Sequence, residues 1–263
     1  MVAGIWRIPI KKEAMSKRLG GTQFVIDGLT YDYCFKESIQ SMQEFCDEVV
    51  IVDAGSRDGT VEVLKTLENE KTKIIYLDRE EWDSLHGWAK LNHFSNKAIA
   101  ELTAEWNFYQ QSDEVVHEKC HKSIREAVDY GTAEAYLVSR INLWNTPYEM
   151  LNVKGNRNPC STQVIRLAKS QYMTGGDAES IYAPASGAYL DRIRIYHFGF
   201  VRNKEVHADK IRNMQANVFE VGVDKKLDGM TTFDPSKWFG PEDLLPVPEI
   251  LPAIMDQWCL ERM

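Results

Sequence analysis

The segment that most constrains the fold is EVVIV at residues 48–52, because it is apolar without interruption and ends directly in an acid and a glycine-rich turn, DAGSRDGT. A short apolar run with no polar alternation is typical of a strand that is covered on both faces, as in a parallel sheet. A helical pattern follows at residues 60–68. This strand–turn–helix unit predicts an α/β fold.

The same alternation continues through the first half of the chain. The sequence predicts further strands at residues 23–29, 73–77 and 106–110, and further helices at 35–45 and 87–102. Strands separated by helices imply right-handed crossovers and a mainly parallel sheet.

The second half has a different pattern. Strands are expected at residues 135–143, 162–167 and 193–196, a helix after residue 197, and a proline-rich tail from residue 228. We therefore divide the chain into an N-terminal extension (1–21), a main domain (22–215) and a C-terminal wrapping segment (216–263).

Composition narrows the classes of protein. The chain has 31 basic and 39 acidic residues, a net charge of −8, which argues against a broad nucleic-acid surface. No stretch approaches the ~20 apolar residues of a membrane helix, and the first residues lack the apolar core of a signal peptide, so a cytoplasmic protein without a transmembrane anchor is expected. The five cysteines, odd in number and without a CxxC pair, are expected to be reduced and mostly buried.

The charge is unevenly distributed. Residues 192–212 carry six basic and two acidic residues, a local charge of +4. The overall acidic excess is therefore compatible with a site for one anionic ligand.

Acidic residues stand where predicted strands end. Asp53 follows the strand at 48–52, and Asp113 and Glu114 follow the strand at 106–110. Ligands of open α/β sheets bind beyond the carboxyl ends of the strands, although a simple strand-to-helix turn would equally account for Asp53. The turn lacks the GxGxxG pattern of dinucleotide-binding proteins, and SRD supplies too little glycine for a methyltransferase-type loop.

The segment EVVIVDAGSRDGTVEVL resembles the nucleotide-binding segment of family 2 glycosyltransferases. The resemblance extends over residues 22–212 and is greatest to a bacterial and phage-type branch of the family. It implies a GT-A-like α/β fold: a mainly parallel nucleotide-binding sheet flanked by helices, with a mixed α/β half on the acceptor side.

The resemblance also implies a donor site. Asp53, with Gly55 beside it, would contact the nucleoside, and Asp113 corresponds to the second acid of the family's DxD motif. The first acid of that motif is replaced by Gln111. Lys90 and Asn92 are further candidates for the donor pocket, and Arg202 and Lys204 for contact with the diphosphate.

A divalent metal is the expected cofactor. Departure of a nucleoside diphosphate builds up negative charge, which a bound cation offsets as a Lewis acid. Asp113 and, by the resemblance, His197 would hold it, and this oxygen and nitrogen pair suits Mn²⁺ or Mg²⁺, the imidazole favouring Mn²⁺. Because Gln111 removes one negative charge, a metal-free site in which Lys or Arg shares the role stays open.

An inverting transfer needs a carboxylate that takes the proton of the acceptor hydroxyl. Asp177 in GGDAES matches the family's acceptor-side acid, and the small residues around it would let an acceptor approach closely; Glu179 is the second candidate. A turn aspartate with no chemical role is the structural alternative.

The expected function is transfer of a sugar from a nucleotide-sugar donor to an unidentified hydroxyl acceptor, metal-assisted and with inversion. Two alternatives stay open. One is a catalytically inactive nucleotide-sugar-binding protein, which Gln111 favours. The other is a nucleotidyltransferase, for which KRLGG at residues 17–21 is a faint match to a basic glycine-rich loop.

Overall fold

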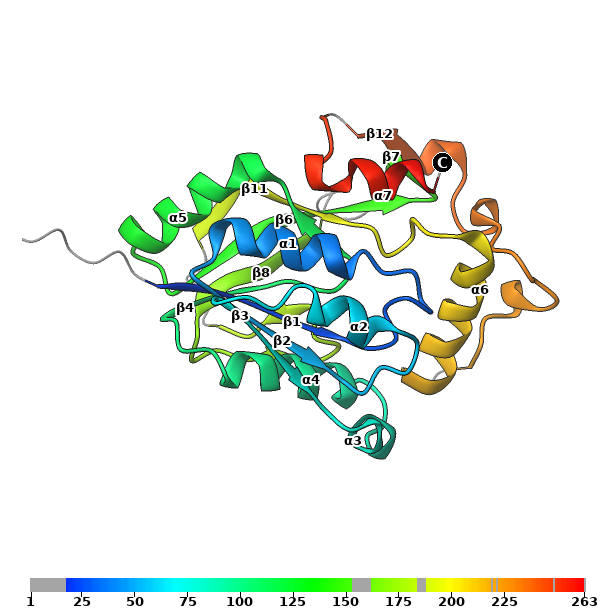
Figure 1. The fold of residues 1–263 in the computed structure, drawn as a ribbon. Helices are drawn as coiled ribbons and strands as arrows, with labels where there is room; N and C mark the ends of the chain where they lie inside the picture. Colours follow the sequence, from blue (N-terminus) through cyan, green and yellow to red (C-terminus); the bar gives the residue numbers. More distant parts are fainter. Residues whose placement is uncertain are drawn as a thin grey trace, which may run out of the picture.

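The computed structural model describes residues 18–152, 162–183, 188–218, 220, 222–247 and 249–262. One large curled sheet runs through the molecule, with helices packed on both of its faces (Figure 1). Within the described part of the chain, no helix is both long and apolar enough to cross a membrane.

The first half forms the parallel part of the sheet. Its strands lie in the order β3-β2-β1-β4 and all three neighbouring pairs are parallel. Their bounds are β1 Leu19–Val25, β2 Glu48–Asp53, β3 Thr72–Tyr76 and β4 Trp106–Tyr109. The helices between and after them are α1 Phe35–Phe45, α2 Thr60–Lys65, α3 Arg79–Ser84, α4 Ala89–Ala100 and α5 His121–Tyr130. The predicted α/β class and the parallel part of the sheet, flanked by helices, are confirmed.

The apolar run in β2 has the expected cause. Val49 and Ile51 pack into a cluster with residues of α1, α2 and α5, whereas Val50 and Val52 pack into a second cluster with residues of α3 and α4. All four side chains are fully buried. Both faces of β2 are therefore covered, which is why polar residues do not alternate along it.

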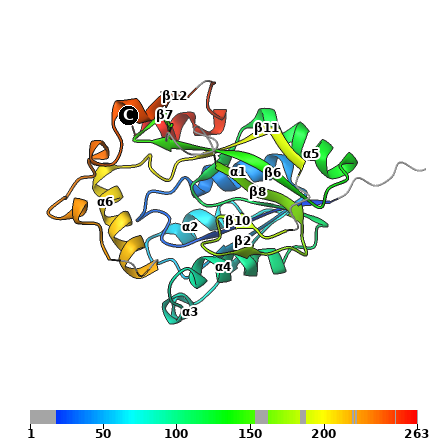
Figure 2. The same ribbon diagram turned by 180° about the vertical axis from the view of Figure 1, so that it is seen from behind.

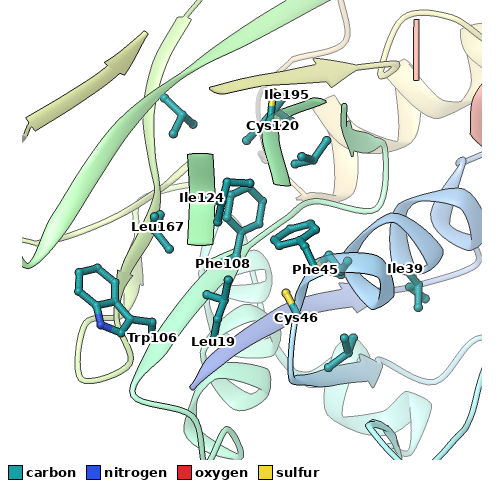
Figure 3. Packing of buried hydrophobic residues seen from close by; sticks show 14 of the residues in the cluster. Leu19, Ile39, Phe45, Cys46, Trp106, Phe108, Cys120, Ile124, Leu167 and Ile195 are labelled. Atoms are coloured by element: carbon teal, nitrogen blue, oxygen red, sulfur yellow. The ribbon is translucent and has the colours of Figure 1, made fainter. Parts of the chain in front are cut away.

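The larger cluster, between the sheet and helices α1 and α5, forms the main core (Figure 3). Phe45 and Phe108 meet edge to face with ring centroids 5.2 Å apart. The four cysteines in the described residues are free and buried, as expected: Cys34, Cys46, Cys120 and Cys259. Cys160 lies outside the described residues.

The first strand begins earlier than predicted, at residue 19 instead of 23. A Cβ on Gly20 would overlap the Leu102 side chain, and one on Gly21 would lie 2.9 Å from Met42 Sδ. The two glycines therefore let the Leu102 and Met42 side chains pack closely on the strand. The KRLGG pattern, which resembled a glycine-rich loop in the sequence, is explained by this close packing. Asp27, with a φ of 44°, turns the chain away after the strand ends.

The second half completes the sheet with mixed strands. β8 (Thr162–Lys169) pairs antiparallel with β4 and with β6 (Ala135–Trp144). β11 (Ala188–His197) runs parallel to β6 and antiparallel to the short β5 (Glu114–Val116). This pairing sets Glu114 opposite His197, so the segment after β4 meets the end of β11.

The remaining elements surround this end of the sheet. They are β7 Thr146–Leu151, β9 Thr174–Gly175, β10 Ser180–Ile181, α6 Lys204–Asn213, β12 Leu244–Pro246 and α7 Asp256–Leu260. The C-terminal segment runs past α6, pairs β12 with β7 and ends in α7 (Figures 1 and 2). Arg262 forms an ion pair with Asp32 and donates to the Trp258 carbonyl, so the chain end is fixed to the loop after β1.

His207 in α6 makes stability depend on pH. Its ring is buried, 3.8 Å from the Phe233 ring centroid, and burial lowers its pKa to about 2. An unfolded histidine has a pKa near ~6.5, so between these values protons bind only the unfolded chain. The stabilisation is complete above that unfolded pKa and is lost on acidification. From pH 7 to pH 5 we expect a loss of about 2 kcal/mol from this group.

The measurement is the free energy of unfolding of wild type and His207→Leu at pH 7 and pH 5. The change in the free energy of unfolding between pH 7 and pH 5 should be smaller in the variant than in wild type. His86→Leu, at a histidine whose side chain is 81% exposed, is the matched control and should leave it unchanged. An undiminished difference in His207→Leu would contradict this account.

Candidate active site

A cavity of about 290 Å³ lies where the parallel strands end and the two halves of the chain meet. Its walls come from β1, α4, the loop after β4, β6, the turn between β9 and β10, the end of β11, and α6. They include six of the ionisable or amide side chains on which the chemistry depends: Gln111, Asp113, Asp177, Glu179, His197 and Lys210. The cavity thus brings together residues that are far apart in the sequence.

Asp113 and His197 face each other in this cavity. Asp113 Oδ1 lies 3.6 Å from His197 Nε2, and each side chain is only 12% exposed. The β5–β11 pairing fixes this approach, and the Asp113 carbonyl also accepts a 2.7 Å hydrogen bond from the Phe198 amide. The two residues predicted as metal ligands are therefore adjacent.

The protonation of His197 follows from its surroundings. Its Nδ1 lies 2.9 Å from the side-chain oxygen of Asn142, which can only accept, so Nδ1 carries the proton. Burial lowers the pKa of His197 although Asp113 opposes the shift, so the ring is neutral at pH 7. The Nε2 lone pair then points at a carboxylate oxygen with no proton between them, an arrangement that suits a bound cation.

Gly199 keeps the space beside this pair open. A Cβ at this position would overlap His197 Nε2 and lie 3.1 Å from Asp113 Oδ2. Among the residues that the structure describes, no group of three or more His, Cys, Asp or Glu side chains could hold a metal. Asp113 and His197 could supply two ligands of a divalent ion, with the other ligands coming from a substrate or water, as is common for Mg²⁺ and chemically similar ions.

Two cations accompany Asp113. Lys210 Nζ lies 3.5 Å and Arg202 Nη2 3.7 Å from its Oδ2. Burial would raise the pKa of Asp113, but His197, Lys210 and Arg202 outweigh burial and hold that pKa well below its usual range. Burial, with Arg202, lowers the pKa of Lys210 to about 7. Lys210 was not singled out from the sequence; only the basic excess of residues 192–212 pointed to it.

Neither of the two predicted diphosphate contacts, Arg202 and Lys204, lines the cavity, although Arg202 forms an ion pair with Asp113 in its wall. Arg202 is buried, donates to the carbonyls of Tyr31 and Gly199, and lies over the Tyr33 ring, so it ties the loop after β1 to the loop after β11. Lys204 is exposed at the first residue of α6 and does not line the cavity. Lys210, two turns along the same helix, is the lysine that does.

Gln111 bridges the two sides of the cavity. Its side-chain amide donates to the Ala178 carbonyl at 3.3 Å, and its oxygen accepts from Arg140 at 3.5 Å. Arg140 also forms an ion pair with Glu179. A carboxylate at position 111 could not donate to Ala178, so the amide is suited to hold the turn that carries Asp177.

Asp177 sits in a tight turn between β9 and β10. Gly176 and Ala178 have φ values of 61° and 58°, and a non-glycine residue in this region indicates local strain that the surroundings must maintain. Asp177 Oδ1 accepts a hydrogen bond from the Glu179 amide at 3.1 Å. In the described part of the chain no cation lies within ion-pair distance of Asp177, whereas Glu179 is paired with Arg140.

Asp53 lies behind the turn that follows β2. Its Oδ2 accepts from the amides of Gly55 and Ser56 at 3.2 and 3.1 Å, while Oδ1 is buried and has no hydrogen-bond partner among the described residues. Burial raises the pKa of Asp53. Gly55 has a φ of 88°, and a Cβ there would lie 2.5 Å from Arg79 Cα, so only glycine fits this position.

A second cavity, of about 90 Å³, adjoins the first and shares Phe24 and Tyr33 with it. Asp27, at the end of β1, forms a 2.7 Å ion pair with Arg79 in its wall. Sequence reasoning missed Asp27 because it lies inside the predicted strand at residues 23–29, whereas the observed β1 ends at Val25.

Lys90 and Asn92 support the cavities without lining them. Lys90 Nζ lies 5.0 Å from the ring centroid of Trp82, which does line the second cavity. Asn92 donates to the Gly176 carbonyl and accepts from the Thr174 hydroxyl, so it fixes the turn beside Asp177.

Glu114 stabilises the loop that follows β4 and carries Asp113. It is fully buried and accepts a 2.6 Å charged hydrogen bond from the equally buried Arg166. It also accepts a 3.0 Å hydrogen bond from the backbone amide of Gln111. Burial raises the pKa of Glu114, but Arg166 and Arg140 outweigh it and leave the pKa below its usual value. Glu114 therefore supports Asp113 structurally and is unavailable as a ligand in the cavity.

Removing Arg166 should be costly, because it leaves Glu114 as a poorly compensated buried charge. We expect Arg166→Leu to lower the free energy of unfolding by about 3–5 kcal/mol, measured by urea denaturation. Lys169→Leu is the control, because Lys169 lies on the same strand as Arg166 but forms a half-exposed ion pair, with Glu134. Its loss should cost less than about 1 kcal/mol. Equal losses in the two variants would contradict this role for Arg166.

A model of one protein family matches part of the chain. Residues 34–143 match the model of glycosyl transferase family 2, in agreement with the resemblance drawn from residues 48–64. No curated protein matches the chain.

Among solved structures, the chain is similar to Staphylococcus aureus TarS 1–349, with 11% identity, a TM-score of 0.46, and coverage of 80% of this chain and 67% of that one. A UDP-GlcNAc complex of the same protein gives 12% identity, a TM-score of 0.46, and coverage of 80% and 68%. Glucosyl-3-phosphoglycerate synthase from Mycobacterium tuberculosis, in complex with Mn²⁺, UDP and glucosyl-3-phosphoglycerate, is also similar. Its identity is 14% and its TM-score 0.35, with coverage of 48% of this chain and 44% of that one.

Proposed function

We propose that this chain, whose residues 34–143 match the family 2 glycosyltransferase model, transfers a sugar from a nucleotide-sugar donor to an acceptor hydroxyl. The observation that carries the proposal is the Asp113–His197 pair, 3.6 Å apart in the cavity. The neutral imidazole and the carboxylate are matched to a divalent cation, and Gly199 leaves the space it needs.

Asp113 and His197 would hold Mn²⁺ or Mg²⁺, which supplies Lewis-acid stabilisation of the departing diphosphate. Lys210, whose amine reaches the same carboxylate from α6, would add a second positive group on that side. We therefore assign to Lys210 the diphosphate contact that the sequence suggested for Lys204. Arg202 acts indirectly, by holding the Tyr31 and Gly199 carbonyls.

Asp177 would act as the base. The acceptor oxygen attacks the anomeric carbon while the bond from that carbon to the diphosphate oxygen breaks, and Asp177 takes the hydroxyl proton. This single displacement inverts the configuration at the anomeric carbon. Among the described residues, Asp177 has no cationic partner, so its carboxylate is not occupied by an ion pair. Glu179 is less suitable because Arg140 holds it.

The smaller cavity, together with the adjoining part of the larger one, would take the nucleoside. Its wall presents Asp27, Arg79 and the Tyr31 ring, and Asp53 supports the neighbouring turn through Gly55 and Ser56. In this proposal Asp53 shapes the nucleoside pocket, with its unpartnered Oδ1 as its remaining hydrogen-bond acceptor.

The contacts of Gln111 weaken the case for an inactive binding protein. Gln111 was the feature that favoured it, but the amide links Arg140 to the turn of Asp177, a role that supports transfer. A nucleotidyltransferase is less favoured as well, because Gly20 and Gly21 lie inside β1 and form no basic phosphate-binding loop.

A thermal-shift screen tests the donor. UDP-, GDP-, dTDP- and CMP-sugars are each added with and without Mn²⁺, and bound ligand should raise Tm by mass action. We expect one nucleotide class to raise Tm more strongly with Mn²⁺ than without it. If no nucleotide sugar changes Tm in either condition, the proposed function is wrong.

A further inference from the structure

Tyr182 is an exposed aromatic residue beside the candidate base. Its side chain is 68% exposed, although it follows directly on β10 and its amide donates to the Met173 carbonyl at 2.8 Å. The backbone is thus fixed while the ring stays open to solvent. β10 packs against β8, and β9, which pairs with β10, packs against α4 (Figure 2).

Two glycines make room for this ring. A Cβ on Gly175 would overlap it, lying 2.5 Å from Tyr182 Cδ2, and a Cβ on Gly176 would lie 3.2 Å from the Tyr182 hydroxyl. The ring therefore rests on the backbone immediately before Asp177. The glycines that the sequence suggested as space for an acceptor are instead in contact with Tyr182, which takes over the surface next to the base.

The support under the ring is well ordered by hydrogen bonds. Asn96 accepts from the Thr174 amide at 2.8 Å, and Asn92 holds the Gly176 carbonyl. A tyrosine on such a support offers a large apolar face at low entropic cost, because only two torsions are restricted on binding.

We propose that Tyr182 is a stacking platform for the acceptor and that the acceptor is a neutral saccharide, an inference that rests on the proposed function. The apolar C–H face of a pyranose can pack on the ring while its hydroxyls donate to Asp177 and Glu179, since ionised carboxylates only accept hydrogen bonds. Among the described residues, Arg140 is the one arginine that lines the cavity, and it is paired with Glu179. Nucleic acid would bring phosphates towards these two acids, and binding it requires unpaired Lys or Arg.

The test is saturation-transfer NMR on the full chain with Mn²⁺, a mixture of UDP, GDP, dTDP and CMP, and the methyl pyranosides of glucose, galactose, mannose and N-acetylglucosamine. We expect saturation of the ring protons of at least one glycoside. Tyr182→Ala should reduce it by about tenfold, as expected for loss of one aromatic stacking contact. Tyr182→Phe, which keeps the ring, should retain it.

Tyr130→Ala, at a tyrosine that is 82% exposed at the end of α5, is the matched control and should leave the glycoside signal unchanged. Base-proton signals of the bound nucleotide report the donor site in the same sample and should be equal in all variants. Nucleotide binding with no glycoside signal in wild type, or a signal unchanged by Tyr182→Ala, would overturn the acceptor proposal alone. Loss of nucleotide signals in wild type would instead count against the proposed function.

Discussion

Replacing Asp177 by asparagine is expected to slow sugar transfer by about a hundredfold to ten-thousandfold, the usual contribution of a positioned general base. Asparagine keeps the side-chain oxygen that accepts from the Glu179 amide, so the turn should be retained. It cannot take the acceptor proton. Nucleotide binding should be unchanged, because in the proposed arrangement Asp177 is not a metal ligand and does not line the smaller, nucleoside-binding cavity.

The measurement combines transfer rate with nucleotide affinity for wild type, Asp177→Asn and Glu179→Gln. Glu179→Gln is the matched control, since Glu179 lines the same cavity but is paired with Arg140. Its effect should be the smaller. Transfer at the wild-type rate by Asp177→Asn would refute the base assignment, and a larger loss in Glu179→Gln would move the role to Glu179.

A methyl group at position 199 should abolish metal-dependent nucleotide binding. Gly199→Ala would place its Cβ against His197 Nε2 and 3.1 Å from Asp113 Oδ2, in the space where the ion is expected. Because both ligands remain in the chain, the variant tests the gap between them. Asp113→Asn, which removes the ligand charge, should behave in the same way, and we expect affinity to fall by at least about a hundredfold in each.

Isothermal titration calorimetry with the nucleotide found in the screen, with and without Mn²⁺, measures the effect. Gly222→Ala is a suitable control because a Cβ there meets no atom within 4 Å. Binding by this control should match wild type. If Gly199→Ala and Asp113→Asn retained the Mn²⁺-dependent gain in affinity, the metal assignment would fail.

The sequence was most informative where local pattern and packing coincide. The helix at residues 35–45 was predicted with its observed bounds, and the apolar run at 48–52 correctly predicted β2, which lies between β1 and β3. These elements are determined by residues close together in the chain. Asp113 was singled out by its place after a predicted strand and by the family resemblance, and His197 by the resemblance. Their proximity depends on the β5–β11 pairing between distant segments.

What escaped prediction depends on tertiary contacts. Lys210 becomes a cavity residue only because α6 packs against the Asp113 loop, and no pattern distinguishes it from Lys204 in the sequence. Gly20 and Gly21 read as a loop because their need for close helix packing is not visible locally. Gln111 read as a missing acid, since its partners Arg140 and Ala178 lie 29 and 67 residues further along the chain.

The most direct test of the central claim is the release of nucleoside diphosphate from UDP-, GDP-, dTDP- and CMP-sugars, with release of CMP followed for the last. It is followed over hours with Mn²⁺ and without added acceptor, so that water takes the place of the acceptor. We predict slow release from one donor class in wild type, dependent on Mn²⁺ and lost in Gly199→Ala. Binding of a nucleotide sugar without any release, with or without saccharides, would contradict the account and identify the chain as an inactive binding protein.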